Sequence, residues 1–69
     1  MFIKVNDRYK KELRINVDSI MYYLPAATSG TEINLKGKIY VTVEESVEEI
    51  DKMIELAQNN KLDWVSLKK

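Results

Sequence analysis

The chain has 69 residues, 45% of them hydrophobic, and its eleven basic and eleven acidic side chains give a formal net charge of zero. This length allows one domain with a small core, and the neutral charge argues against a strongly basic nucleic-acid-binding surface. Cysteine and histidine are both absent, which excludes disulfides, the usual zinc sites and the Ser-His-Asp and Cys-His nucleophile systems. Because a small domain without such groups often gains stability by self-association, we expect a homo-oligomer.

Residues 1–43 have the two-residue periodicity of β-strands. Pro25 ends one of these strands because proline has no N–H to donate, and a loop follows it. Lys36-Gly37-Lys38 is the turn of a hairpin in which Gly37 supplies a positive φ. The sequence therefore predicts an antiparallel β-meander of four to five strands. The expected strands are residues 2–5, 13–17, 20–24, 31–35 and 39–43.

The third expected strand is apolar on both of its faces. Strict alternation places Ile20, Tyr22 and Leu24 on one face and Met21 and Tyr23 on the other. We expect Tyr22 to lie in the core. Met21 and Tyr23 are then left on the opposite side of the sheet.

From Ser46 onwards the apolar residues recur at helical spacing. Ser46-Val47-Glu48-Glu49 is a capping box, in which each of the two outer side chains accepts from the backbone N–H of the other residue. We expect one amphipathic helix over residues 46–58, ended by Asn59-Asn60. The predicted fold class is α+β, with the meander and one C-terminal helix packed on one of its faces, in a single domain over residues 1–69.

The last segment, residues 61–69, is an apolar tail that contains Trp64, the only tryptophan. Three placements are open for it. It can fold back on the sheet, add a strand to the edge of its own sheet, or add a strand to a neighbouring molecule.

The two parts of the chain carry opposite charge. Residues 1–43 contain seven Lys or Arg and four Asp or Glu, whereas residues 44–69 contain four Lys and seven Asp or Glu, which gives +3 and −3. This pattern is typical of a solvated acidic helix face beside a mildly basic sheet. It also allows two copies to pair head to tail, or one charged face to meet a partner.

The sheet face away from the helix is the main candidate for a binding site. One short helix covers only one face, so apolar side chains remain on the other, and such patches often mark interfaces. The leading hypothesis is a non-enzymatic regulatory or adaptor module. Its expected partners are a second copy of the chain and a host or regulatory protein, which would bind through this face, its edge or the tail. The candidate binding or interface residues are Arg14, Met21, Tyr22, Tyr23, Lys36, Lys38, Tyr40 and Trp64.

Two alternatives use part of the same set. In one, a small phage or bacterial protein sequesters a nucleotide or another small molecule between subunits, with tyrosines stacked on the base and basic side chains on the phosphate. In the other, the same face binds nucleic acid. We expect no catalytic residue, metal ligand or cofactor. The tyrosines are Tyr22, Tyr23 and Tyr40, and the basic residues are Arg14, Lys36 and Lys38.

No stretch approaches the roughly 18 consecutive apolar residues that a bilayer-spanning helix needs. The first residues also lack the long apolar segment of a signal peptide. Together with the absence of cysteine, these features predict a cytoplasmic protein of a bacterium or its virus that binds no membrane.

Three segments carry a family resemblance: Asn16-Val17-Asp18-Ser19-Ile20, the Gly37-Lys38 hairpin that follows Thr31-Glu32-Ile33-Asn34-Leu35, and the helix start at Val43-Glu44-Glu45-Ser46-Val47-Glu48-Glu49-Ile50. In these segments the chain resembles the small flagellar and swarming-motility protein family, and it is similar to small β-rich phage and bacterial proteins. The resemblance covers roughly residues 1–55. It implies a regulatory or accessory interaction module without catalytic residues.

Overall fold

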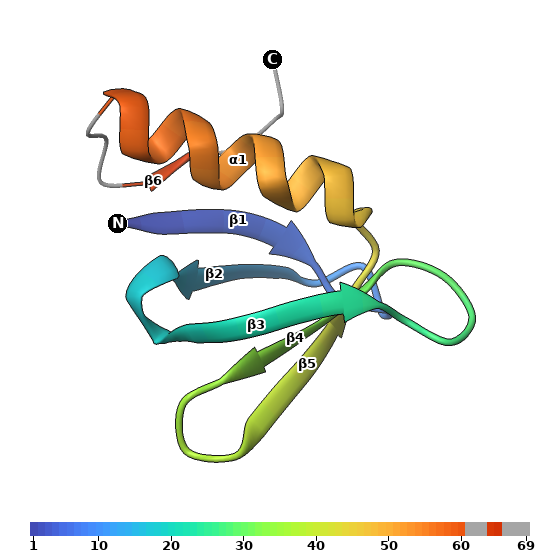
Figure 1. Ribbon diagram of the computed structural model, residues 1–69. Coiled ribbons are helices and arrows are strands. Elements are labelled where there is room, and N and C mark those ends of the chain that lie inside the picture. Colours follow the sequence, from blue (N-terminus) through green and yellow to red (C-terminus); the bar gives the residue numbers. More distant parts are fainter. Residues whose placement is uncertain (61–63, 66–69) are drawn as a thin grey trace.

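The computed structural model describes residues 1–60 and 64–65. It is an α+β fold with five antiparallel strands in two sheets and one helix packed against them (Figure 1). This confirms the predicted class. The elements are β1 (Phe2–Asn6), β2 (Glu12–Asn16), a 3₁₀ turn η1 (Val17–Ser19), β3 (Ile20–Pro25), β4 (Thr31–Leu35), β5 (Ile39–Val43), α1 (Val47–Asn60) and β6 (Trp64–Val65).

The strands are divided between two sheets, with the orders β2-β1-β6 and β3-β4-β5, where the sequence suggested one meander. The division lies at η1, between β2 and β3. There the Asn16 side chain accepts from the N–H of Asp18 at 3.0 Å, and the Ile20 N–H donates to the Val17 carbonyl. These local hydrogen bonds turn the chain out of the first sheet and into the second.

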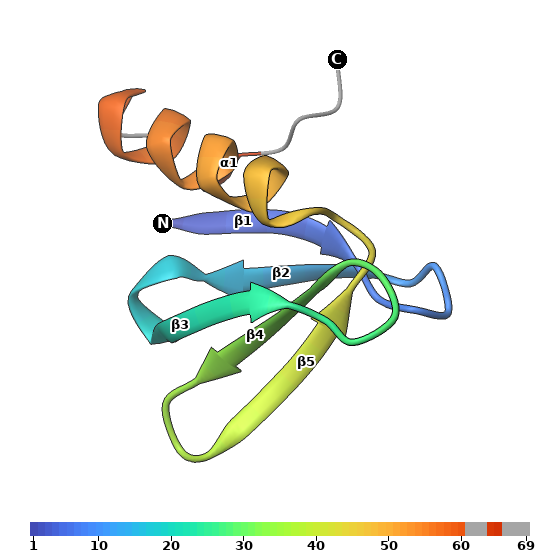
Figure 2. The same cartoon turned by 45° about the vertical axis from the view of Figure 1, so that its right-hand side comes forward.

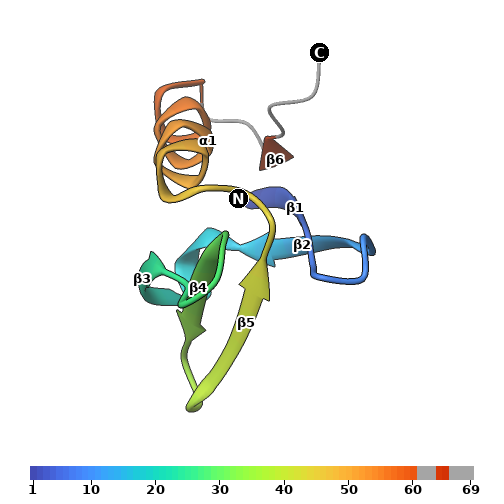
Figure 3. The same ribbon diagram turned by 90° about the vertical axis from the view of Figure 1, so that its right-hand side faces the viewer.

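The core lies between the two sheets and the helix, which enclose it from three sides (Figure 3). The helix α1 lies against β1, β3 and β6. Each sheet therefore has one face that contributes to the core and one that faces solvent. The buried hydrophobic residues are Ile3, Val5, Ile15, Ile33, Val43, Ile50, Met53 and Ala57.

A β-bulge in β3 reverses the expected facing of its aromatic residues. Ile20 pairs with Leu35, but Tyr22 pairs with Asn34, so Met21 is the extra residue. A shift of one residue moves every following side chain to the other face. The expectation of a buried Tyr22 is therefore wrong, because Tyr22 is 56% exposed, while Tyr23 packs against the core.

The predicted hairpin and helix start are confirmed. Gly37 has a φ of +88°, and Lys38 beside it also has a positive φ, of 61°. At the helix start the Ser46 N–H donates to Glu49 Oε1 at 2.8 Å, and the Glu49 N–H donates to Ser46 Oγ at 3.1 Å. The helix ends at Asn60, two residues beyond the expected end at 58.

The predicted apolar tail is described at two residues only. Trp64 and Val65 form β6, which pairs in parallel with Phe2 and Ile3 of β1. Of the three placements considered, the structure therefore has the strand on the edge of its own sheet. The rest of the predicted tail, 61–63 and 66–69, lies outside the described residues.

The segment between β5 and α1 is hydrogen-bonded to the end of β1. The Glu45 carboxylate accepts from the Asn6 N–H at 3.0 Å and from Asn6 Nδ2 at 3.1 Å. The Glu44 N–H donates to the Asn6 carbonyl at 2.8 Å, and Thr31 Oγ1 donates to the Glu45 carbonyl at 2.7 Å. These contacts link both sheets to the segment that leads into the helix, and Figure 2 shows this segment passing the end of β1.

Candidate functional site

The solvent-exposed face of the β3-β4-β5 sheet, called here the outer face, has two tyrosines in one row. Asn34 of β4 pairs with Tyr22 on one side and with Tyr40 on the other. Tyr22 and Tyr40 are 56% and 63% exposed, and the adjacent Met21 is 64% exposed. Asn34 Nδ2 also donates to Glu32 Oε2 at 3.1 Å. The outer face is therefore an aromatic surface with a polar centre.

The two lysines of the predicted set lie at one end of this sheet. Lys36 and Lys38 belong to the turn between β4 and β5, and the Lys36 N–H donates to the Ser19 carbonyl at 2.9 Å. Because β3 begins at that point, the lysines lie at the same end of the sheet as Met21. The structure thus brings Met21, Tyr22, Tyr40, Lys36 and Lys38 to one part of the molecule.

The other members of the predicted set lie elsewhere. Arg14 is in the other sheet, opposite Lys4, with its Nη2 3.6 Å from Glu12 Oε2. The Tyr23 hydroxyl donates to the Asp51 carboxylate. Burial, together with this hydrogen bond, raises the pKa of Tyr23 to about 12.

Trp64 also belongs to the other sheet, because β6 pairs with β1. Arg14 and Trp64 are therefore separated from the outer face, and Tyr23 is directed to the core side of its own sheet. A single binding surface that uses all eight predicted residues does not exist within one copy of the described chain.

The edge of β5 away from β4 is available for pairing along most of its length. Near Val43 this edge is covered by a bridge to Asp7, and the Glu44 N–H donates there to the Asn6 carbonyl. Because hydrogen-bonding groups alternate sides along a strand, the N–H groups of Tyr40 and Thr42 point to the same edge as that of Glu44. Within the described part of the chain, no strand pairs with this edge from residue 39 to 42.

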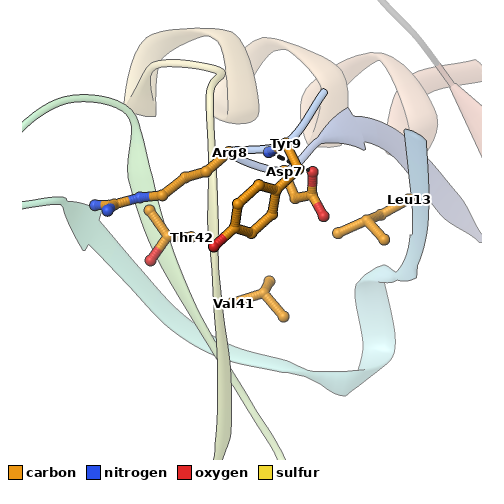
Figure 4. A pocket seen from close by; sticks show the side chains of 6 residues that line it. All are labelled: Asp7, Arg8, Tyr9, Leu13, Val41 and Thr42. Carbon is orange, nitrogen blue, oxygen red and sulfur yellow. Dashed lines mark hydrogen bonds between the residues drawn. The ribbon is translucent and has the colours of Figure 1, made fainter. Parts of the chain in front are cut away.

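An open pocket of about 340 Å³ lies beside the β5 edge (Figure 4). Leu13 of β2 and Val41 of β5 supply apolar side chains from the two sheets, and both are only half-buried. The Tyr9 ring lies over the space between them, and the Arg8 guanidinium points away from it. The lining residues are Asp7, Arg8, Tyr9, Leu13, Val41 and Thr42.

The loop between β1 and β2 holds Tyr9 at the mouth of this pocket. The Asp7 carboxylate accepts from the N–H groups of Tyr9 at 2.8 Å and Lys11 at 2.9 Å. Arg8 Nη2 donates to Thr28 Oγ1 at 3.1 Å, which connects this loop to the one between β3 and β4. The sequence predicted a turn here from Asn6 and Asp7, but gave no signal that the turn borders a pocket.

The chemistry of this region suits the binding of a polypeptide strand. The β5 edge presents backbone N–H and C=O groups, and the pocket beside it presents apolar side chains. No group of three or more Asp or Glu side chains that could hold a metal ion occurs among residues with described side chains.

Comparison of the chain with protein-family models, with curated proteins and with solved structures finds no match. The resemblance to the flagellar and swarming-motility family therefore stays a prediction. Of the helical residues that the structure describes, none belong to a helix long and apolar enough to cross a membrane.

Proposed function

We propose that this protein is a non-enzymatic interaction module, with a regulatory or adaptor role, that binds an extended polypeptide segment along the edge of β5. The observation that supports this proposal is the position of residues 39–42, whose outer edge pairs with no strand of the described chain, directly beside the apolar pocket. In strand addition, the main-chain hydrogen bonds supply affinity and pockets for alternate side chains supply specificity. Both requirements are met at one place on this small domain.

The two faces of the sheet would contact alternate side chains of the incoming strand. Side chains on the inner side would meet Val41 and Leu13 in the pocket. Those on the other side would meet Tyr40 on the outer face. Since each fully buried aliphatic side chain contributes about 2 kcal/mol, the pocket is the part that selects which strand binds.

A labelled peptide with the sequence of residues 36–44 tests this function by fluorescence anisotropy. We expect saturable binding of this peptide, and no binding of a control peptide in which proline replaces Tyr40, because that peptide lacks an N–H that would donate to the edge. In the protein, Thr42→Pro removes an N–H that faces the free edge, a position at which proline is compatible with a strand. It should weaken binding at least tenfold, whereas Thr42→Val should not. Equal binding by folded Thr42→Pro protein would contradict the proposal.

A second candidate function is the binding of a nucleotide or a nucleic acid at the outer face. The observation that favours it is the location of Tyr22, Tyr40, Lys36 and Lys38 at one end of one sheet. Stacking on such side chains is tolerant of sequence, and phosphate contacts make affinity fall steeply with salt. Titration of a labelled oligonucleotide at two salt concentrations, with a nucleotide thermal-shift screen beside it, tests this candidate.

A further inference from the structure

β5 lacks the features that usually prevent an edge strand from pairing with another molecule. The outer edge of β3 has a bulge at Met21 and a proline at its end, Pro25, and β2 contains Glu12 and Arg14. Bulges, prolines and charged side chains are the common protections of exposed edges. β5 is the regular sequence Ile-Tyr-Val-Thr-Val, with none of the three.

Charges flank β5 in a way that favours antiparallel pairing with a second copy. Lys36 and Lys38 precede the strand and Glu44 follows it. Lys36 lies toward β3, where its N–H donates to the Ser19 carbonyl, but in an antiparallel pair Lys38 approaches the glutamate of the other copy, whereas a parallel pair would bring like charges together. Glu44 Oε2 is 3.9 Å from the exposed Lys10 Nζ, so the incoming lysine would extend an existing ion pair.

The free part of the edge determines the alignment of the two strands. In a two-fold antiparallel pair, directly opposite residues have their side chains on the same face of the sheet, so the residue at the two-fold axis lies opposite its own copy. Within the free part of the edge, that residue is Tyr40 or Val41. Centring on Val41 would need Val43 as a partner, and that end of the edge is already covered by Asp7. Centring on Tyr40 uses residues 38–42, and its outward N–H and C=O would form two hydrogen bonds with those of the other Tyr40.

This alignment places an apolar side chain beside the pocket. The residue opposite Val41 would be Ile39 of the second copy, on the same face of the sheet. Ile39 is 58% exposed in the single chain, so it has apolar surface that a second copy can bury. The pocket beside Val41 is apolar and open, so each copy has both the side chain and the space that the other needs.

We infer that two copies of this chain pair antiparallel through β5, with Tyr40 at the two-fold axis and Ile39 of each copy in the pocket of the other. This inference rests on the proposed function, because it names the strand that the edge accepts. The two three-stranded β3-β4-β5 sheets become one six-stranded sheet. On its outer face the row Tyr22, Asn34 and Tyr40 continues into the same row of the second copy.

The absence of cysteine makes the alignment testable by disulfide formation. Directly hydrogen-bonded antiparallel partners have Cα atoms about 5.5 Å apart, within the range that a disulfide bridges. Tyr40→Cys protein should therefore form a covalent dimer under mild oxidation. The matched control is Tyr22→Cys, which is similarly exposed but lies two strands from the axis and should stay monomeric on a denaturing gel.

Sedimentation equilibrium over a range of protein concentrations measures the association itself. Ile39→Asp would place a charge in the apolar pocket and should raise the dimer dissociation constant at least tenfold. Tyr22→Asp, at an almost equally exposed position of the same sheet, should leave it unchanged. Circular dichroism confirms that both variants are folded.

The outcomes separate this inference from the proposed function. A dimer that Ile39→Asp dissociates, with a disulfide at Tyr40→Cys, supports pairing through β5. A chain that stays monomeric at millimolar concentration but binds the 36–44 peptide overturns the inference and leaves the interaction function standing. A dimer that is insensitive to Ile39→Asp overturns it also, since another surface must then form the interface.

Discussion

Replacement of Gly30 by alanine should destabilise this protein far more than the same replacement at Gly37, although both glycines have a positive φ, +81° and +88°. A Cβ built at Gly30 overlaps the carbonyl oxygen of Val43, and it lies 3.1 Å from the carbonyl carbon and 3.3 Å from Glu44 Cα. At Gly37 the nearest atom is the Ile39 Cδ1, 3.8 Å away, which is an ordinary contact. Both substitutions therefore force an alanine into the left-handed conformation, but only the one at Gly30 also makes the new Cβ overlap neighbouring backbone atoms.

The left-handed conformation costs an alanine about 1 kcal/mol at either site. At Gly30 the neighbouring backbone must also move, and overpacking of that kind costs about 2 kcal/mol more. The movement is resisted because Val43 is buried and pairs with Thr31, and the Glu44 N–H is bonded to Asn6. A domain of this size has a total stability of about 3–10 kcal/mol, so Gly30→Ala removes a large part of it.

Urea and thermal unfolding, followed by circular dichroism at one protein concentration, measure both losses. For a domain of this size 1 kcal/mol corresponds to about 4–8 °C in Tm, so we expect a fall of about 5 °C for Gly37→Ala and of about 15 °C or more for Gly30→Ala. Equal losses at the two sites would refute the reasoning, because they would mean that the Gly30 loop moves away from Val43 at little cost.

Three further predictions concern single side chains. Glu45→Ala should lower the free energy of unfolding by about 1–3 kcal/mol, since it leaves the half-buried Asn6 N–H without its acceptor; Glu45→Gln, which keeps one acceptor oxygen, should lose less in the same urea titration. The free energy of unfolding should fall as pH rises from about 10 to about 12, because the unfolded chain releases the Tyr23 proton near pH 10 while the folded chain holds it. The Tyr23→Phe variant should lack this part of the decline. If its free energy of unfolding falls with pH as steeply as that of the unmodified protein, the contact with Asp51 is unimportant. Lys38→Gly should raise Tm by a few degrees, because Lys38 has a φ of 61°; a lower Tm would show that the lysine makes a compensating contact.

The parts of the fold that follow from short segments could be predicted. The Gly37 turn and the Ser46–Glu49 capping box each depend on a few adjacent residues whose chemistry specifies one local geometry. Both occur in the structure at the expected residues. The bounds of β4 and β5 coincide with the expected ones, and those of β1, β2 and β3 differ from them by one residue.

The facing of β3 could not be predicted because it depends on a bulge. Strict alternation puts Tyr22 inside and Tyr23 outside, and the extra residue at Met21 exchanges them. Nothing in the local sequence distinguishes a regular strand of Ile, Met and Tyr from a bulged one. The preference arises from the helix, where Asp51 accepts from the Tyr23 hydroxyl, and from the buried Ile33 opposite Tyr23.

The candidate site was predicted in part. The exposure of Tyr40 and Met21 and their nearness to the turn lysines follow from strand alternation and the hairpin. The pocket was missed, because Leu13 and Val41 are distant in the sequence and face each other only after the chain divides into two sheets. Its position next to the β5 edge is likewise a property of the assembled sheets.

The parallel pairing of β6 with β1 has a consequence for the order of folding. β3, β4 and β5 are consecutive strands and can pair as soon as they are made, whereas Phe2 of β1 must wait for Trp64. Because pairings between distant residues form slowly, a folding chain completes the β3-β4-β5 sheet while the other sheet still lacks β6. The free edge of β5 is therefore formed in a folding chain before β6 is added to the first sheet.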